Sequence, residues 1–160
     1  MPSLSTFWKV FRGNSRRHVF NFFPAFRGTG GRVGFVSPDF RELRVVLPLN
    51  WRTRNYVGTI FGGSLYAAVD PFYMIMLIEI LGPDFVVWDK AASIRFRRPG
   101  RSTLHARFVV PPEETDAIRK ALESAPSVER VYAVDLVDAA GVPHATVEKT
   151  IYIRRRKEPE

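Results

Sequence analysis

The sequence predicts a fold of the α+β class, and three observations support this prediction. One apolar passage of helical length, residues 65–81, stands in the middle of the chain. Five shorter segments around it alternate between apolar and polar residues or are apolar in part, as strands do. Strands and helices do not alternate along the chain, so nothing in the pattern favours a parallel sheet.

The first part of the chain predicts a helical extension followed by a strand. Apolar residues recur at helical spacing in residues 1–22, without the apolar core and cleavage site of a signal peptide. We expect this extension to pack on its own domain or on a neighbouring subunit rather than on a membrane. Residues 23–33 are rich in glycine and proline and predict a loop, and residues 42–49 alternate as a strand. We assign residues 23–160 to a single domain.

The apolar passage at residues 64–81 predicts a buried helix. It is only as long as the shortest membrane spans, and it contains Asp70, Pro71 and Glu79, so a membrane span is the weaker interpretation. A helix that is apolar on nearly all sides belongs inside a protein, and a curved sheet wrapped around it would bury it.

Four further strands are expected after this helix, at residues 85–98, 103–110, 128–137 and 145–153. The turn Arg-Pro-Gly-Arg at residues 98–101 predicts that the first two form a hairpin, and a second turn predicts another hairpin from the last two. Residues 113–125 are polar with helical spacing and predict a surface helix between the hairpins.

Composition limits the classes of function. The chain has 160 residues and no cysteine, and its three histidines lie far apart, so neither a disulfide nor a metal site is expected. This composition fits a cytoplasmic protein. The net charge of +8 is concentrated in residues 1–60, which hold 10 basic and 2 acidic residues. No nucleic-acid motif accompanies the basic residues, so a phosphate-bearing small ligand is the favoured partner.

The most informative segment is residues 55–70, with the sequence NYVGTIFGGSLYAAVD. Gly62 and Gly63 allow close backbone approach, and Ser64 can cap the helix that follows. The first N–H groups of that helix are suited to stabilise a developing negative charge. Asp70 is a carboxylate in an otherwise apolar helix, which favours a catalytic role.

The spacing of Asn55, the diglycine and Asp70 resembles that of the acyl-CoA thioesterases of the hotdog fold, related to the phenylacetate-pathway thioesterase. The segments FGGSLYAAVDP and VVWDKAASIRFRRPG look like a branch of uncharacterised function, some members of which are labelled tetrameric acyl-CoA thioesterases. In that branch Phe61 stands where better-known members have histidine. The resemblance implies a hotdog fold, a curved antiparallel sheet wrapped around a central apolar helix, and assembly as a homodimer or homotetramer with shared active sites.

The resemblance also implies three catalytic residues, each with a structural alternative. Asp70 would act as general base or nucleophile, or it would simply cap a second helical segment that begins at Pro71. The Asn55 amide would help to hold the attacking water, or it would be a turn residue. The Gly62 N–H would polarise the thioester carbonyl, or the diglycine would only make a tight turn.

Further residues are candidates for substrate binding. Phe61 and Gly63 adjoin the proposed oxyanion site, and the apolar side chain of Phe61 leaves open a protein that binds without catalysis. Asp89 would assist Asp70 or pair with Lys90 at the surface. Guanidinium groups suit the phosphates of coenzyme A, although they also suit a solvated strand face. The candidate arginines are Arg95, Arg97, Arg98 and Arg101.

The sequence therefore predicts an enzyme that hydrolyses a fatty or aromatic acyl-CoA to the free acid and coenzyme A, without metal or organic cofactor. The main alternative is a non-catalytic hotdog protein that binds acyl-CoA or lipid. A hydratase acting on enoyl-CoA is a minor alternative, because such an enzyme is expected to have a histidine near the aspartate and none lies near Asp70 in sequence. We expect neither nucleic acid nor stable membrane insertion.

Overall fold

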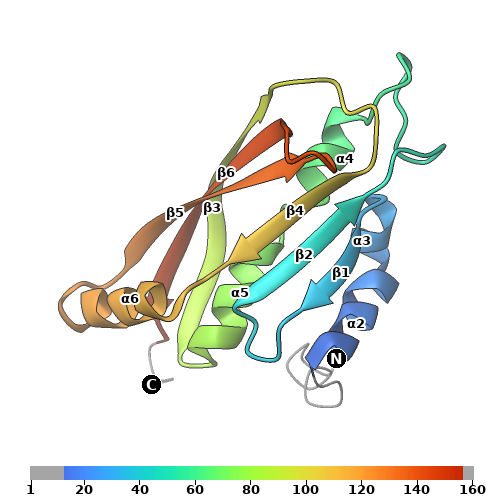
Figure 1. Cartoon of the computed structure of the whole chain (residues 1–160). Coiled ribbons are helices and arrows are strands. Elements are labelled where there is room, and N and C mark those ends of the chain that lie inside the picture. Colours follow the sequence, from blue (N-terminus) through green and yellow to red (C-terminus); the bar gives the residue numbers. More distant parts are fainter. Residues whose placement is uncertain (1–12, 157–160) are drawn as a thin grey trace.

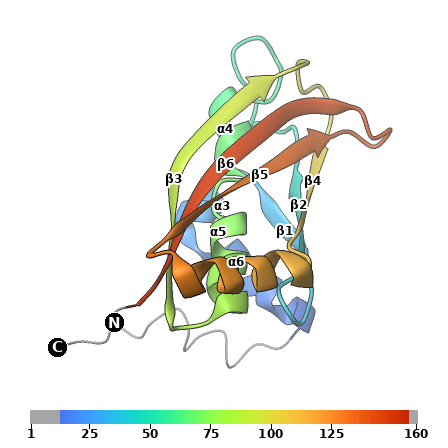
Figure 2. The ribbon, with the colours of Figure 1, turned by 90° about the vertical axis from the view of Figure 1, so that its left-hand side faces the viewer.

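The computed structural model describes residues 13–156, and the fold is of the predicted α+β class. The strands are β1 (Arg32–Val36), β2 (Glu42–Leu47), β3 (Phe85–Phe96), β4 (Leu104–Val109), β5 (Val128–Val137) and β6 (Pro143–Arg155). They form one six-stranded sheet in the order β1-β2-β4-β5-β6-β3, and every neighbouring pair is antiparallel. Figures 1 and 2 show that this sheet curves around a central helical passage, as expected of a hotdog fold.

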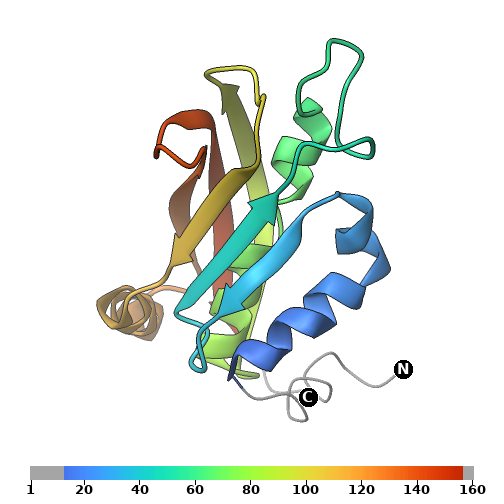
Figure 3. The ribbon, with the colours of Figure 1, turned by 45° about the vertical axis from the view of Figure 1, so that its right-hand side comes forward.

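The helices are η1 (Gly13–Arg16), α2 (Arg17–Phe22), α3 (Pro24–Gly28), α4 (Gly62–Ala67), α5 (Phe72–Leu81) and α6 (Pro112–Ser124). The helices α4 and α5 follow one another along the inside of the sheet, and α2 and α3 lie beside β1 (Figure 3). Within the described residues, only the passage from α4 to α5 is long and apolar enough to cross a membrane by length and composition. Here it lies inside the curved sheet, as a core helix does (Figure 1).

The core is centred on Phe72, a fully buried residue at the start of α5. Its ring lies 5.6 Å from the ring of Phe20, 5.1 Å from that of Phe26 and 5.3 Å from that of Phe108, measured between centroids. Burying a side chain of this size contributes about 1.5–3 kcal/mol. Since Phe20 belongs to α2, the described part of the N-terminal extension packs on its own domain, as expected. Residues 1–12 lie outside the described part of the chain, and a boundary at residue 22 stays a prediction.

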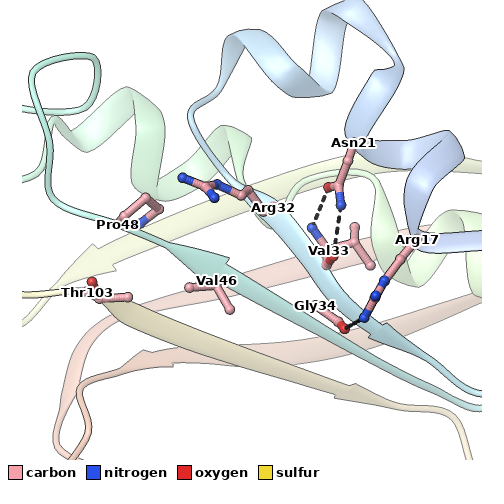
Figure 4. A pocket seen from close by; sticks show the side chains of 8 residues that line it. All are labelled: Arg17, Asn21, Arg32, Val33, Gly34, Val46, Pro48 and Thr103. Carbon is pink, nitrogen blue, oxygen red and sulfur yellow. Dashed lines mark hydrogen bonds between the residues drawn. The ribbon is translucent and has the colours of Figure 1, made fainter. Parts of the chain in front are cut away.

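The two edges of the sheet differ. Beside the β1 edge, the amide of Asn21 in α2 donates to the Val33 carbonyl at 3.0 Å and accepts from the Val33 N–H at 2.8 Å (Figure 4). The helix thereby protects this edge from pairing with another chain. At the other edge, β3 pairs only with β6 among the described residues, and Ala91, Ala92 and Ser93 are exposed there. An uncovered strand of this length is a surface on which a second strand can pair.

Two expectations from the sequence are wrong. The first predicted hairpin does not exist, because β3 pairs with β6 while β4 lies between β2 and β5. The Arg-Pro-Gly-Arg segment is therefore a crossing between strands that are not neighbours. The glycine-rich stretch at residues 23–33 is not only a loop, because it forms α3 and the start of β1. The second predicted hairpin, β5 with β6, is confirmed.

Candidate active site

Asp70 lies in the turn that separates α4 from α5. Pro71 has no N–H, which interrupts the helical hydrogen bonds, and residues 68–71 form a turn between the two helices. The Asp70 N–H still donates to the Tyr66 carbonyl at 3.0 Å, so the backbone around the carboxylate is fixed. No side chain caps α5, so the interpretation of Asp70 as a helix cap is wrong.

The Asp70 carboxylate is held by one oxygen. Oδ1 accepts hydrogen bonds from the Tyr66 hydroxyl at 2.6 Å and from the Lys149 ammonium at 2.5 Å. Tyr66 and Asp70 are four residues apart, which places them on the same side of the helical passage. Burial, and secondly the hydrogen bond to Asp70, raise the pKa of the Tyr66 hydroxyl, so it remains a donor at neutral pH. The Asp70 side chain is 41% exposed, and within residues 13–156 Oδ2 has no recorded hydrogen bond.

Lys149 contacts Asp70 and is not among the candidates that the sequence predicts. It lies in β6 with its side chain toward the helices, and the side chain is 1% exposed. Burial lowers the pKa of the ammonium, but the hydrogen bonds to Asp70 and to Asp89 outweigh burial, and the net shift is upward. The alternation of β6 does indicate that Lys149 is buried, because it is the one charged residue in a row of inward-facing positions. The other members of this row are Ala145, Val147, Ile151 and Ile153.

Asp89 of β3 approaches the same ammonium from the other side. Its Oδ2 lies 2.9 Å from the Lys149 Nζ, and the side chain is 24% exposed. Its Oδ1 is buried and has no hydrogen-bond partner among the described residues. Burial raises the pKa of Asp89, the charge of Asp70 adds to this effect, and Lys149 opposes it. Lys90 pairs with Glu129, so the interpretation of Asp89 as half of a surface pair with Lys90 is wrong.

The helix α4 begins at Gly62. A helix capped by Ser64 would begin about one turn later. Ser64 is buried in the helix and does not cap it, because α4 has no side-chain cap. The first amides of a helix have no carbonyl partner within the helix, so those of Gly62 and Gly63 are available to a ligand. A Cβ at Gly62 would lie 3.1 Å from the Phe96 ring, and a Cβ at Gly63 would lie 2.3 Å from the Phe61 ring. Two aromatic rings therefore lie against the start of the helix.

Asn55 lies beside an open hollow of about 390 Å³ next to the helix start. Its amide holds its own turn, because Nδ2 donates to the Thr59 hydroxyl at 2.9 Å and Oδ1 accepts from the N–H groups of Val57 and Thr59. Asn55 is thus a turn residue, and this does not conflict with a contact to water, because Nδ2 retains one hydrogen for another acceptor. The hollow is lined by Asn55, Thr59, Ile60, Gly62, Leu65, Phe96, Arg97, Arg98, Pro99 and Gly100.

The arginine cluster is only partly beside this hollow. Arg97 and Arg98 line it, but the Arg97 Nε donates to the Thr146 hydroxyl at 2.7 Å. The backbone N–H groups of Arg97 and Arg98 both donate to the His144 carbonyl, which fixes the end of β3. The side chain of Arg101 is exposed and does not line the hollow.

The structure therefore arranges the predicted residues in two groups. Asp70 and Asp89 meet at Lys149, while Asn55, Gly62, Arg97 and Arg98 line the hollow at the other end of α4. Gly62 and Asp70 are eight positions apart, a separation that corresponds to about 12 Å on a continuous helix, and here the turn at residues 68–71 lies between α4 and α5. Among residues 13–156 no group of three or more His, Cys, Asp or Glu side chains is placed to hold a metal ion.

Comparison with known proteins identifies the family. Residues 14–153 match a family described as a domain of unknown function, DUF4442. The chain belongs to this family. No curated protein matches the chain.

Solved structures share the fold of this DUF4442 protein at low sequence identity. A protein of unknown function from Pseudomonas aeruginosa, PA5026, described as a probable thioesterase, is 20% identical with a TM-score of 0.76, over 88% of this chain and 93% of that one. The thioesterase HI1161 from Haemophilus influenzae is 13% identical with a TM-score of 0.65, over 91% and 93%. A mutant of the phenylacetic acid degradation protein PaaI from Thermus thermophilus is 22% identical with a TM-score of 0.57, over 81% and 97%. These similarities confirm the hotdog-type fold.

Proposed function

We propose that this protein hydrolyses the thioester of an acyl-CoA, with a fatty or aromatic acyl group, to the free acid and coenzyme A. The observation that carries the proposal is the Asp70 carboxylate, which is fixed through Oδ1 while its side chain stays 41% exposed. A carboxylate held in this way presents Oδ2 to a ligand. The motif resemblance and the thioesterase descriptions of structural relatives support the reaction class.

In the proposed reaction Asp70 is a general base. Oδ2 accepts a proton from a water molecule, and the water oxygen bonds to the thioester carbonyl carbon while the carbonyl oxygen takes up the negative charge. When the tetrahedral intermediate collapses, the C–S bond breaks and the proton on Asp70 passes to the departing sulfur. The products are the acid and the thiol of coenzyme A, and no cofactor takes part.

The oxyanion needs a donor that Asp70 and its neighbours do not supply. The Gly62 N–H is the proposed donor, and it is eight positions from Asp70 in the same chain, a separation that corresponds to about 12 Å on a continuous helix. Both groups must lie about 3 Å from adjacent atoms of one thioester. We therefore propose that Gly62 of one protomer serves Asp70 of its partner, in a dimer or dimer of dimers that pairs through the uncovered edge of β3.

The other candidate residues take supporting roles in this proposal. The remaining Asn55 amide hydrogen holds the attacking water, and Phe61 and Gly63 lie beside the acyl thioester. The guanidinium groups of Arg98 and Arg101, with the free nitrogens of Arg97, contact the phosphates of coenzyme A.

A second candidate function is acyl-CoA or lipid binding without hydrolysis. Phe61 favours this function. It is 57% exposed beside the diglycine. The better-known thioesterases that share the motif have a hydrogen-bonding histidine at this position. Release of free thiol from a series of acyl-CoA chain lengths separates the two. A binder would retain acyl-CoA and release no thiol with any of them.

The test of the catalytic role is Asp70→Asn, with Asp116→Asn as matched control. Asn keeps the size of the side chain and removes the basic oxygen, so kcat is expected to fall about 10²-fold or more. Asp116 is an exposed residue of α6, and the same substitution there should leave kcat unchanged. Full turnover by Asp70→Asn would exclude Asp70 as the base.

The shared site is tested by mixing two inactive variants. Gly62→Pro removes the proposed N–H donor, and the extended backbone of Phe61, with φ −62° and ψ 133°, accepts a following proline. Gly62→Ala is the control, since it also adds a Cβ near Phe96 but keeps the N–H. Co-refolded Gly62→Pro and Asp70→Asn subunits should regain partial activity, because one site of each mixed dimer combines two unaltered residues. No recovery after proven subunit exchange would return the chemistry to a single chain.

A further inference from the structure

The buried ammonium of Lys149 lies between two carboxylates, and only one of them is needed as a base. Resting on the proposed function, we propose that Lys149 is a positioning residue that fixes Asp70 through Oδ1, and that Asp89 keeps the ammonium paired whenever Asp70 takes up a proton. Three elements supply the groups. Lys149 comes from β6, Asp89 from β3, and Asp70 from the turn between α4 and α5.

Lys149 can fix the carboxylate because it comes from an interior strand. β6 is paired on both sides, with β5 and with β3, so its backbone cannot shift independently of the sheet. The ammonium also lies 3.5 Å from the Tyr66 hydroxyl, and both donors converge on the same oxygen of Asp70. Two donors from different elements define the plane and the tilt of the carboxylate. Oδ2 is then the oxygen that meets the substrate water.

Asp89 has a role because the charge of the cluster changes during the reaction. Before proton transfer, one ammonium faces two carboxylates, and the cluster carries one net negative charge. After Asp70 accepts a proton, the cluster is neutral, and Lys149 and Asp89 remain as an ion pair at 2.9 Å. Without Asp89 the same step would leave a buried ammonium with no anion beside it, which is a costly state. Asp89 therefore lowers the cost of protonating Asp70.

The two neighbours act on Asp70 in opposite directions. The groups that face the ammonium are Tyr66 from α4, Asp70 from the inter-helical turn and Asp89 from β3. An adjacent cation favours the ionised carboxylate, and an adjacent anion disfavours it. The raised pKa of Asp89 agrees with this arrangement, because burial and then the charge of Asp70 make its ionised form less stable. Removing Lys149 should therefore disfavour the ionised form of the Asp70 carboxylate, and removing Asp89 should favour it.

The experiment compares Lys149→Met, Lys149→Arg and Asp89→Asn, with Lys90→Met as matched control. Lys90 is the residue after Asp89, and its ammonium pairs with Glu129 at the surface, without contact to Asp70. Two readouts are used on each full-length variant. One is the acid limb of the kcat/KM profile, and the other is the titration of the Asp70 carboxyl carbon by ¹³C NMR, assigned by its loss in Asp70→Asn.

We expect the acid limb of kcat/KM to move to higher pH in Lys149→Met and to lower pH in Asp89→Asn, because the charge beside the carboxylate changes in opposite senses. The NMR signal of the carboxyl carbon should follow both changes. In Asp89→Asn kcat should also fall while KM changes little, because Asp70 becomes a weaker base. Lys149→Arg should restore the wild-type acid limb, and Lys90→Met should match the wild-type protein. If Lys149→Met does not fold, the downward shift in Asp89→Asn still tests the proposal.

Shifts in the same direction for the two variants, or no shift in either, would overturn the inference. This failure is distinct from failure of the proposed function. Absence of thiol release by the wild-type protein, or full activity of Asp70→Asn, would refute hydrolysis by Asp70, while the NMR titration would still show whether Lys149 and Asp89 control that carboxylate.

Discussion

Removal of the Lys149 ammonium should lower the free energy of unfolding by an amount that the structure bounds. Lys149→Met keeps the length of the side chain and leaves Asp70 and Asp89 facing each other without a cation. Breaking a buried ion pair costs about 3–5 kcal/mol. Asp70 is 41% exposed and Asp89 24%, so water can solvate part of the remaining charge, and the lower end of about 3 kcal/mol applies. For a chain of this size that corresponds to a fall in Tm of roughly 6–12 °C.

Urea unfolding followed by tryptophan fluorescence at pH 7 measures this loss. The double variant Lys149→Met, Asp89→Asn should be less destabilised than the sum of the single changes, by about 1–3 kcal/mol, because the residues touch. Lys90→Met, in which an exposed pair is lost, should cost about 1 kcal/mol or less. The raised pKa of Lys149 means that its contribution is complete below the ordinary lysine value of 10.5 and is lost as the pH rises through the folded value. A loss near that of Lys90→Met, or strict additivity, would refute the reasoning.

Three further predictions concern other parts of the chain. Arg98→Ala should raise KM for acyl-CoA roughly 10-fold with kcat little changed, and acyl-pantetheine, which lacks the nucleotide phosphates, should show no such effect in the same assay. Gly63→Ala should leave Tm unchanged or higher, because alanine favours the helix by about 0.5–1 kcal/mol. The same substitution should lower kcat/KM, because the new Cβ would lie 2.3 Å from the Phe61 ring and must displace it. The pKa of Glu42 is lowered to about 2, mainly by its hydrogen bond with Arg107, so the ionised Glu42 stabilises the fold above the usual carboxyl pKa and this stabilisation is lost as the pH falls toward 2. Glu42→Gln should therefore lower Tm at pH 7 and not at pH 2.

Sequence periodicity predicts most of the elements of this fold but not their pairing. The central helix, the surface helix α6 and the strands β2 to β6 were all predicted from apolar spacing and turn residues. The Arg-Pro-Gly-Arg turn predicted the wrong neighbours, because a local turn signal contains no information on which distant strand completes the sheet. Helix α3 is not predicted, because this short helix begins at a proline and ends at a glycine, which are residues that also form loops.

The candidate site shows the same division. Asp70 and the diglycine were found because both belong to one continuous motif, in which the order of residues is the order in space. Lys149 is not predicted although its position in β6 alternates with those of more exposed residues. The reason is that a lysine in a strand is usually exposed to solvent. Only the contact between β6 and the inter-helical turn, 79 residues apart, shows that its charge is paired.

Asp89 shows why strict alternation fails at this site. The sequence places Ala92, Ile94 and Phe96 on one face of β3, and period 2 would then put Asp89 on the opposite face with Ser93. The register shifts between Asp89 and Ala91, so that Asp89 lies opposite Ile151 and Ala92 lies opposite Lys149. Both partners in β6 face the helices, and the extra residue in β3 therefore turns the Asp89 carboxylate inward, toward the ammonium. A bulge of one residue thus places the second carboxylate of the cluster, and no pattern of apolar residues within β3 records it.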